Sequence, residues 1–173
     1  VHISSRDDVV VEDNTFELND QGIFVENSEV TIHRNTLELD GRGIYASNSQ
    51  VDIRNNVVVS ENGRGVVCEN QCGDAIVNNT LVGDDGDYGV FISNQSAPVV
   101  KNNIIEGFET GIHADNDLPN YNIANNALWD QDEGMFSGTA MPPLIGQMVA
   151  ANANGDTSDI YGNIAFDPGF AGG

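Results

Sequence analysis

The sequence is poor in cations, in cysteine and in long apolar runs, and each shortage excludes a class of protein. It has 6 Lys and Arg residues against 27 Asp and Glu residues among 173, so its net charge is -21. Because phosphate binding needs clustered cations, we expect no nucleic-acid partner. No run reaches the roughly 18 consecutive apolar residues of a membrane-spanning helix, so we expect no membrane insertion. Two cysteines are too few for a disulfide scaffold.

What the chain does contain is an internal repeat of slightly more than 20 residues. Each unit has an apolar pair, two polar residues, an Asn, an apolar residue, a variable loop, a Gly and an apolar triplet. VVVEDNTFELNDQGIFVENS aligns with VTIHRNTLELDGRGIYASNS and VDIRNNVVVSENGRGVVCEN. The Asn recurs at Asn14, Asn35, Asn56, Asn79, Asn103 and Asn126, and the Gly at Gly22, Gly43, Gly65, Gly89, Gly111 and Gly134.

Apolar residues alternate within each unit, which is the period of a strand and not of a helix. Short strands bounded by Gly, Asn and Asp at this spacing predict an all-β solenoid. Three strands are expected per rung, for example 43–46, 51–53 and 57–59, with about seven rungs in all. We expect the recurring Asn to lie at the bend before the third strand, and stacked rungs to align these residues into an internal Asn ladder.

These repeats resemble the right-handed parallel β-helix proteins of the pectate-lyase-like superfamily, and in particular secreted or periplasmic NosD-like (PbH1) repeats. The resemblance covers nearly the whole chain and implies a right-handed parallel β-helix. The superfamily includes lyases, hydrolases, epimerases, adhesins and inert stalks, so the resemblance does not single out a function. With the charge balance, it indicates an extracellular or cell-surface protein, with the periplasm as the alternative.

We expect a single β-helix domain over residues 1–173. Both ends of the sequence fall in phase with the rungs and neither carries an amphipathic capping helix, so we expect a fragment of a longer chain. Further rungs or domains of that parent chain would then be its partners. Residues 137–159 depart from the repeat and are predicted to be an insertion, with a short helix around 144–151.

The first strand of each rung is the face where binding is expected. Its inward column would read Ile23/Val25, Ile44/Ala46, Val66/Cys68, Val90/Ile92 and Ile112/Ala114. The outward column would read His2, Phe24, Tyr45, Val67, Phe91, His113 and Phe136, at a spacing of about 4.8 Å. An exposed aromatic stripe of this kind suits an oligosaccharide track, with Phe24, Tyr45, Phe91, His113 and Phe136 as substrate-binding residues. The alternative is that loops or the insertion cover the stripe.

Candidate catalytic residues lie on the same face. In the families that the chain resembles, Arg or Lys acts there as a base, and Ca²⁺ acidifies a uronate. Arg42 and Arg64 occupy matching GRG positions and could clamp a carboxylate, or could pair with neighbouring acids. His113 and Asp115 are two residues apart on one strand, so they share a face and could form a dyad.

Two further clusters suggest an ion site and a covalent link. Asp84, Asp85 and Asp87 share one loop and Glu109 follows on the next rung, which predicts either a Ca²⁺ site or a solvated acidic surface. A Ca²⁺ site would raise the melting midpoint when Ca²⁺ is added. Cys68 and Cys72 are close enough in sequence to close a disulfide across a tight turn in an oxidising compartment.

Three functions remain open at this point. The first is a secreted or cell-surface module that binds polysaccharide through the aromatic stripe without catalysis. The second is a carbohydrate-active enzyme on the strand-one face: a polysaccharide lyase, an epimerase or a glycoside hydrolase. The third is a structural or adhesive repeat.

Overall fold

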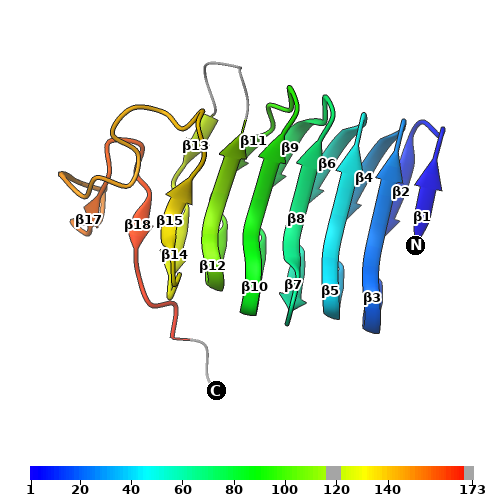
Figure 1. Cartoon of the computed structure of the whole chain (residues 1–173), viewed down its shortest axis with the longest axis horizontal. Coiled ribbons are helices and arrows are strands. Elements are labelled where there is room, and N and C mark those ends of the chain that lie inside the picture. Colours follow the sequence, from blue (N-terminus) through cyan, green and yellow to red (C-terminus); the bar gives the residue numbers. More distant parts are fainter. Residues whose placement is uncertain (116–121, 170–173) are drawn as a thin grey trace.

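The computed structural model describes residues 1–115 and 122–169. Within these residues the chain is all-β and has no helix. Its strands form two sheets, and every pairing between successive turns is parallel until the strands after residue 149. The turns stack side by side along the long axis of the molecule, as Figure 1 shows, so the chain is a parallel β-solenoid.

One sheet receives a single strand from each turn. Its members are β2 (Val9–Glu12), β4 (Glu29–His33), β6 (Gln50–Arg54), β9 (Gly73–Val77), β11 (Val99–Lys101) and β13 (Asn122–Ala124). This six-stranded sheet counts about six turns, where the sequence predicted about seven rungs. The difference arises because residues 137–163 add no strand to this sheet.

The other sheet is twelve-stranded and wraps around the rest of each turn. Its members are β1 (His2–Ser4), β3 (Thr15–Glu26), β5 (Thr36–Ser47), β7 (Val57–Ser60), β8 (Arg64–Glu69), β10 (Thr80–Ser93), β12 (Ile104–Asp115), β14 (Ala127–Trp129), β15 (Gly134–Ser137), β16 (Ala150–Ala151), β17 (Thr157–Ser158) and β18 (Ile164–Ala165).

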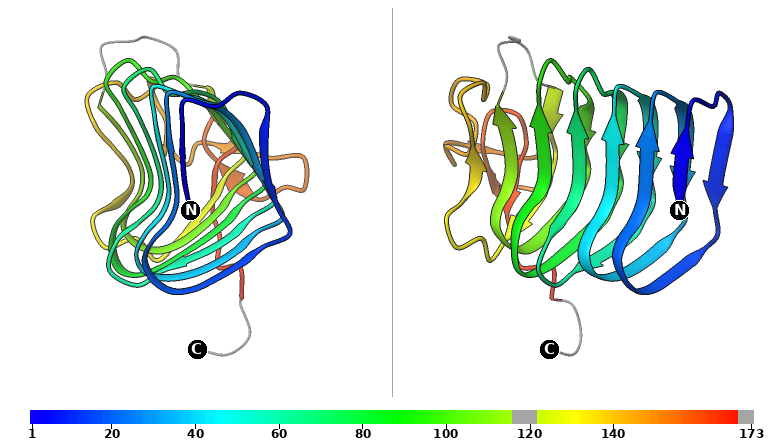
Figure 2. Two further views of the ribbon diagram at one scale, coloured as in Figure 1. Left: turned by 90° about the vertical axis from the view of Figure 1, so that its right-hand side faces the viewer. Right: turned by 45° about the vertical axis from the view of Figure 1, so that its right-hand side comes forward.

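In most turns the predicted third and first strands run together as one bent strand. This holds for β3, β5, β10 and β12, whereas β7 and β8 stay separate. The pairing shifts register within β3 and within β10, which places bulges at the corner. Bulges let a strand bend while its pairing continues on either side. Figure 2 shows the resulting cross-section, in which successive turns superpose closely.

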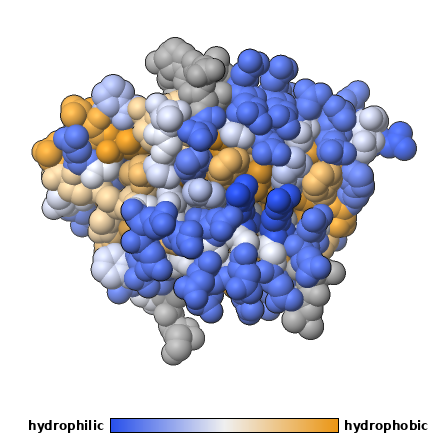
Figure 3. All heavy atoms as spheres, viewed as in Figure 1, coloured by the Kyte–Doolittle hydropathy of each residue, from blue (hydrophilic) through white to orange (hydrophobic). Residues whose placement is uncertain are grey.

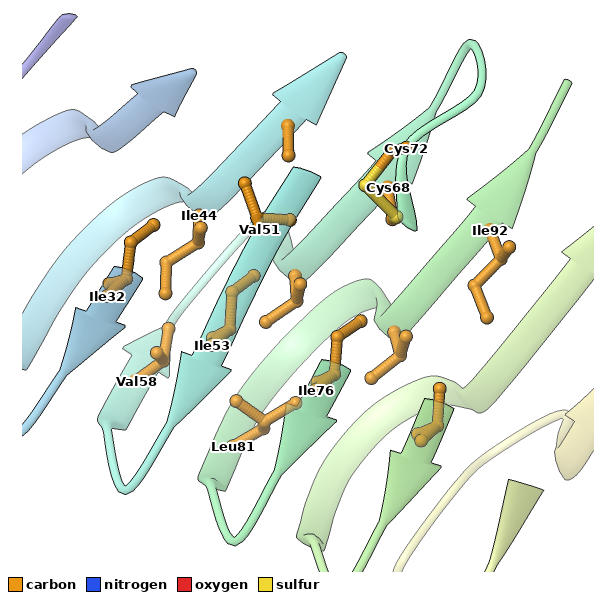
Figure 4. Close-up of a cluster of buried hydrophobic side chains, with 14 of the residues drawn as sticks. Ile32, Ile44, Val51, Ile53, Val58, Cys68, Cys72, Ile76, Leu81 and Ile92 are labelled. Atoms are coloured by element: carbon orange, nitrogen blue, oxygen red, sulfur yellow. A yellow bond between two sulfur atoms is a disulfide. The ribbon is translucent and has the colours of Figure 1, made fainter. Parts of the chain in front are cut away.

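The inward column predicted for the first strands forms one wall of the core. Its ten members are all buried, from Ile23 at 1% exposed to Ala114 at 0%. They meet apolar residues of the six-stranded sheet, such as Ile32, Val51 and Ile53 (Figure 4). The alternation in the sequence therefore records which side chains enter the core.

The recurring glycines lie where successive turns approach most closely. A Cβ atom on Gly65 would lie 2.6 Å from the carbonyl oxygen of Gly89, and one on Gly22 would lie 2.6 Å from that of Gly43. Real Cβ atoms do not approach backbone oxygen this closely, so the column accepts only glycine without a backbone shift. From Gly22 to Gly111 the repeat keeps Gly for space and not for a left-handed backbone, whereas Gly134 has a φ of 143° and no atom within 4 Å of an added Cβ.

The recurring Asn side chains are joined by hydrogen bonds from turn to turn. Each Nδ2 donates to the Oδ1 of the next Asn at 3.0–3.1 Å, in the order Asn14, Asn35, Asn56, Asn79, Asn103, Asn126 and Asn163. The same Oδ1 also accepts the backbone N–H of the preceding Asn. From Asn35 to Asn126, Nδ2 also donates to a main-chain carbonyl of the preceding turn. We call this series the Asn ladder.

A buried carboxylate receives the last amide of the ladder. Asn163 Nδ2 donates to Asp159 Oδ2 at 3.0 Å, and the backbone N–H of Asn163 donates to Asp159 Oδ1 at 2.9 Å. Asp159 is 1% exposed and also accepts the N–H groups of Gly146 and Tyr161. A buried charge needs such partners, so these four donors account for its place in the core.

At the bend before the third strand of each turn, one residue has a left-handed backbone. It is the residue that precedes the ladder Asn, and not the ladder Asn itself. Asp13, Arg34, Asn55, Asn78, Asn102 and Asn125 all have φ between 55° and 57°. The ladder Asn then starts the next extended segment with its side chain inside. Two adjacent residues thus form the bend: the first has the left-handed backbone, and the second, the ladder Asn, supplies the buried amide.

Residues 138–159, which follow β15, leave the solenoid path, and the short helix predicted around 144–151 does not form. This segment contains a turn at 143–146 and the antiparallel pair β16–β17. Gly138 and Gly146 have φ of 108° and 72°, values at which a right-handed helix cannot continue. The segment is held to the ladder through Asp159 and to the core through Ile145.

The ladder predicts a large difference between two Asn→Ala substitutions. Asn56→Ala should lower the free energy of unfolding by about 2 kcal/mol, because it leaves buried amide groups of Asn35 without an acceptor. Asn62→Ala changes an exposed Asn and should cost less than about 0.5 kcal/mol. Urea denaturation of both variants measures this, and equal midpoints would contradict a stabilising role for the ladder.

Candidate functional site

The strand-one face is built from β1, β8, β15 and the C-terminal halves of β3, β5, β10 and β12. Pairing places His2 opposite Phe24, Phe24 opposite Tyr45, and Tyr45 opposite Val67. It continues from Val67 to Phe91 and from Phe91 to His113. Figure 3 views this face, where hydrophilic residues border smaller apolar areas. The outward column therefore follows one line as far as His113.

The rings in this column stack on one another. Phe24 and Tyr45 have centroids 4.5 Å apart and planes 6° apart, and Phe91 and His113 have centroids 5.1 Å apart and planes 2° apart. Val67, which is 1% exposed, separates the two ring pairs. A ring face already covered by its neighbour is not free to stack on a sugar, so this column presents mainly ring edges.

Phe136 does not belong to the outward column, contrary to the sequence alignment. β15 pairs with β12 so that Phe136 lies opposite Ile112, and Ser137 lies opposite His113. The ring is partly buried against the core. The alignment had equated Gly134 with Gly111, whereas Gly134 pairs with Thr110. A slip of one residue turns every side chain to the other face of a strand.

The two candidate arginines occupy adjacent turns and lie over aromatic rings. Arg64 Cζ is 4.5 Å from the centroid of Phe91 and 5.1 Å from that of Tyr88. Its Nε pairs with Asp87 at 3.2 Å. Arg42 Cζ is 5.7 Å from the centroid of Tyr45. Arg64 thus already pairs with a carboxylate, and its guanidinium lies over the rings of Tyr88 and Phe91.

A groove of about 950 Å³ runs beside the rings, where the first strands end. Amide side chains form half of its lining, with two carboxylates, two hydroxyls and one ring: Asn48, Asn70, Gln71, Asn94, Gln95, Glu69, Asp115, Ser93, Thr139 and Phe91. Amides both donate and accept hydrogen bonds, and so do sugar hydroxyls. The groove therefore suits a ligand rich in hydroxyl groups.

The exposed amides beside the groove are ordered by contacts between turns. Asn48 Nδ2 donates to Asn27 Oδ1 at 2.6 Å, and Asn94 Nδ2 donates to Asn70 Oδ1 at 3.1 Å. Gln71 Nε2 donates to Gln95 Oε1 at 3.4 Å. Their spacing follows that of the strands, so the groove presents a repeating row of amides.

Glu69 links the groove to the ring pair. It accepts a short hydrogen bond from the Tyr45 hydroxyl. Burial raises the pKa of Tyr45, and the Glu69 carboxylate raises it further by favouring the neutral phenol. Tyr45 therefore acts in this contact as a donor that holds Glu69 at the groove.

At the other end of the groove, His113 lies between a hydroxyl and a carboxylate. Its Nδ1 is 2.8 Å from Ser137 Oγ, and its Nε2 is 3.5 Å from Asp115 Oδ2. Asp115 Oδ1 accepts the backbone N–H of Thr139 at 3.2 Å and its hydroxyl at 3.0 Å. These two bonds, and then His113, lower the pKa of Asp115. The arrangement could let His113 accept a proton from a hydroxyl.

The four carboxylates that the sequence offered as Ca²⁺ ligands do not form a metal site. Asp84, Asp85, Asp87 and Glu109 are all exposed, and Asp87 pairs with Arg64. Across residues 1–115 and 122–169, no group of three or more His, Cys, Asp or Glu side chains could hold a metal ion. Ca²⁺ requires several oxygen ligands around one point, which these separated side chains do not supply.

Residues 1–85 match the model of a family described as periplasmic copper-binding protein (NosD). This match covers about half of the chain and ends within β10. Both sheets and the repeats continue beyond it with the same pairing. The chain is a parallel β-helix repeat protein. No curated protein and no solved structure matches it significantly.

The copper named in that family description does not fit the side chains of this β-helix. Copper prefers imidazole, thiolate and thioether ligands. His2 and His113 lie on strands at opposite ends of the strand-one face, and His33 lies in the other sheet. Cys68 and Cys72 are joined in a disulfide. Among the described residues, the histidines and cysteines therefore bring no set of copper ligands together.

Neither described segment of the β-helix contains a helix with the length and apolar character needed to cross a membrane.

The groove is formed partly by the ends of first strands and partly by the turns that follow them. Strand alternation in the sequence identified Phe91 and Asp115, and it could not identify Gln71, Gln95 or Thr139, which lie in turns. One signal was available in the repeat alignment. The connections at 70–72 and 94–98 hold three and five residues, whereas those at 27–28 and 48–49 hold two.

Metal addition tests the correction about Ca²⁺. We expect the melting midpoint to be the same in CaCl₂ and in MgCl₂ at equal ionic strength, since both ions only screen the net charge of -21. Thermal denaturation followed by circular dichroism measures this. A midpoint clearly higher in CaCl₂ than in MgCl₂ would restore the Ca²⁺ site.

The bonds between Asp115 and Thr139 predict a pH-dependent contribution to stability. Because the pKa of Asp115 is lowered on folding, its contribution is complete above the usual Asp value of about 3.9 and is lost as the pH falls through the lowered value. Asp115→Asn should therefore be less stable than the wild type at pH 6, with the difference shrinking towards pH 3.

Denaturation midpoints across this pH range measure the effect, with the exposed Asp132→Asn as control. A difference that stays constant from pH 6 to pH 3 would contradict it.

Proposed function

We propose that this β-helix is a binding module for polysaccharide that works outside the cytoplasm, in the periplasm or at the cell surface, without catalysis of its own. The single observation that carries the proposal is the amide-lined groove beside the strand-one face. The match to a family described as periplasmic and the presence of a disulfide support the location.

The groove suits an extended glycan in its chemistry and in its direction. Asn48, Asn70 and Asn94 lie on successive turns, so their amides could meet successive sugar units of one chain. Phe91 adds an apolar ring edge to the lining, and the Phe24–Tyr45 ring pair continues the line towards β1. A binding surface that repeats along the solenoid matches a ligand that is itself a repeat.

The charge of the protein selects among glycans. Its net charge is -21, and Glu69 and Asp115 both line the groove. Polyanionic chains would be repelled, so neutral or amine-bearing polysaccharides are the expected ligands.

Binding to a panel of soluble polysaccharides, measured by calorimetry, tests this function. We expect the double variant Gln71→Ala/Gln95→Ala to bind at least about tenfold more weakly, because it removes two groove amides at turns whose backbone it leaves alone. The matched control is Gln147→Ala, an exposed glutamine in the 137–159 segment. No binding by the wild type across the panel would sink the proposal.

A carbohydrate-active enzyme is the second candidate, and the contacts of His113 favour it. His113 lies against Ser137 and Asp115 at one end of the groove, and Arg42 and Arg64 lie along the same face. A uronate-cleaving enzyme would need these arginines, whereas the binding module would not.

Release of new reducing ends from acidic and neutral polysaccharides separates the two candidates. Release that is lost in His113→Ala, in a variant with unchanged melting midpoint, would make the protein an enzyme. Binding without release, unaffected by His113→Ala, is the result expected for the binding module.

A further inference from the structure

The Cys68–Cys72 disulfide lies under the groove, at the point where the turns change length. Cys68 belongs to the inward column of β8 and is 0% exposed, and Cys72 precedes β9 and is 1% exposed. Figure 4 shows the bond at the end of β8, directed into the core. The bond spans three residues, Glu69, Asn70 and Gln71, and all three line the groove.

Cys72 takes the place of a serine that recurs in the neighbouring turns. Gly73 donates its N–H to the carbonyl of Ser49, and the N–H of Cys72 donates to Ser96 Oγ at 3.0 Å. Ser49 is therefore the counterpart of Cys72 in the turn before, and Ser96 is its counterpart in the turn after.

These buried serines tie the shorter turns together. Ser49 Oγ donates to the carbonyl of Ser47 at 2.8 Å and accepts the N–H of Ser28 at 3.1 Å. Ser28 makes the same two kinds of contact, with Glu26 and with Arg6. A sulfur in a disulfide has no hydroxyl proton to donate, so at Cys72 the covalent bond replaces this contact within the turn.

The turn under the disulfide has a second left-handed residue. The turns at 27–28 and 48–49 have a single left-handed position, Asn27 or Asn48, at φ 49°. The turn under the disulfide has two, Asn70 at 56° and Gln71 at 64°. The next turn has the same pair, Asn94 at 52° and Gln95 at 65°, without a disulfide. Left-handed backbone is unfavourable for side chains other than glycine, so a covalent bond across residues 69–71 limits the other conformations open to this turn.

We infer that Cys68 and Cys72 are a positioning pair, whose disulfide holds the 69–71 turn in the conformation that forms the wall of the groove and thereby sets its affinity for glycan. The affinity part of this inference rests on the proposed function. The disulfide contacts the ligand site only through the turn, since both cysteines are buried. It also couples binding to an oxidising compartment, because a reduced turn loses its constraint.

The chain supplies a variant that removes the bond with little harm to packing. Cys68→Ala places in the inward column the residue found at Ala46, its partner in the preceding turn. Cys72→Ser places in the turn the residue found at Ser49 and Ser96. Because both substitutions copy neighbouring turns, the double variant Cys68→Ala/Cys72→Ser should keep the solenoid fold.

Amide hydrogen exchange and calorimetric titration with the polysaccharide bound by the wild type test the inference together. We expect exchange at residues 69–72 to speed up on the order of tenfold in the double variant, with exchange in β5 and β10 unchanged. We expect the affinity to fall by about tenfold. Asn56→Ala is the control for general destabilisation, and it should leave both exchange at 69–72 and affinity as in the wild type.

Unchanged exchange at 69–72 in the double variant would overturn the inference. Faster exchange with unchanged affinity would overturn the role of the turn in binding. If the wild type binds no polysaccharide, the proposed function fails and the affinity part fails with it, whereas the exchange measurement still decides whether the disulfide positions the turn.

Discussion

The Asn ladder is the interaction on which the rest of this structure depends. A parallel solenoid must bury the polar backbone of its bends, and buried polar groups are costly without partners. Each ladder amide from Asn35 to Asn126 donates to a main-chain carbonyl of the preceding turn and accepts the side-chain amide of the Asn in that turn. The ladder thereby fixes the register between turns, and register decides which side chains face the core and which face the groove.

The strand-one face follows from that register. Stacked turns bring Phe24 against Tyr45 and Phe91 against His113, and they bring the amides of Asn27 and Asn48 into contact. The ring faces are covered because the rings stack on each other. The polar turns beside them therefore present the groups that a ligand could contact. The proposed binding site thus lies at the turns, whose length varies from repeat to repeat. The regular stacking of the repeats sets the spacing of the groups along the site.

Much of this was predictable from the sequence, and the failures have physical causes. The repeat predicted the all-β solenoid, the buried Asn residues and the inward column, because burial leaves a regular apolar period. Phe136 was misplaced because an alignment cannot detect a slip of one residue where the repeat weakens. The groove was missed because Gln71 and Gln95 are set by turn length and left-handed backbone, which alternation does not record. The contact of His113 with Ser137 depends on the pairing of β15, which the weakened repeat also hid.

The ladder also has a direction. Every Nδ2 from Asn14 to Asn126 donates towards the following turn, and at Asn163 the acceptor is the carboxylate of Asp159. Aligned amide dipoles polarise one another, so the series behaves as a chain of hydrogen bonds that ends on a negative charge. The ladder residues from Asn35 to Asn126 make the same kinds of hydrogen bond. A whole turn of the solenoid could therefore be duplicated or deleted between them without leaving an unpaired amide. Asp159 accepts but cannot donate onward, so the ladder formed by the described residues ends at this carboxylate.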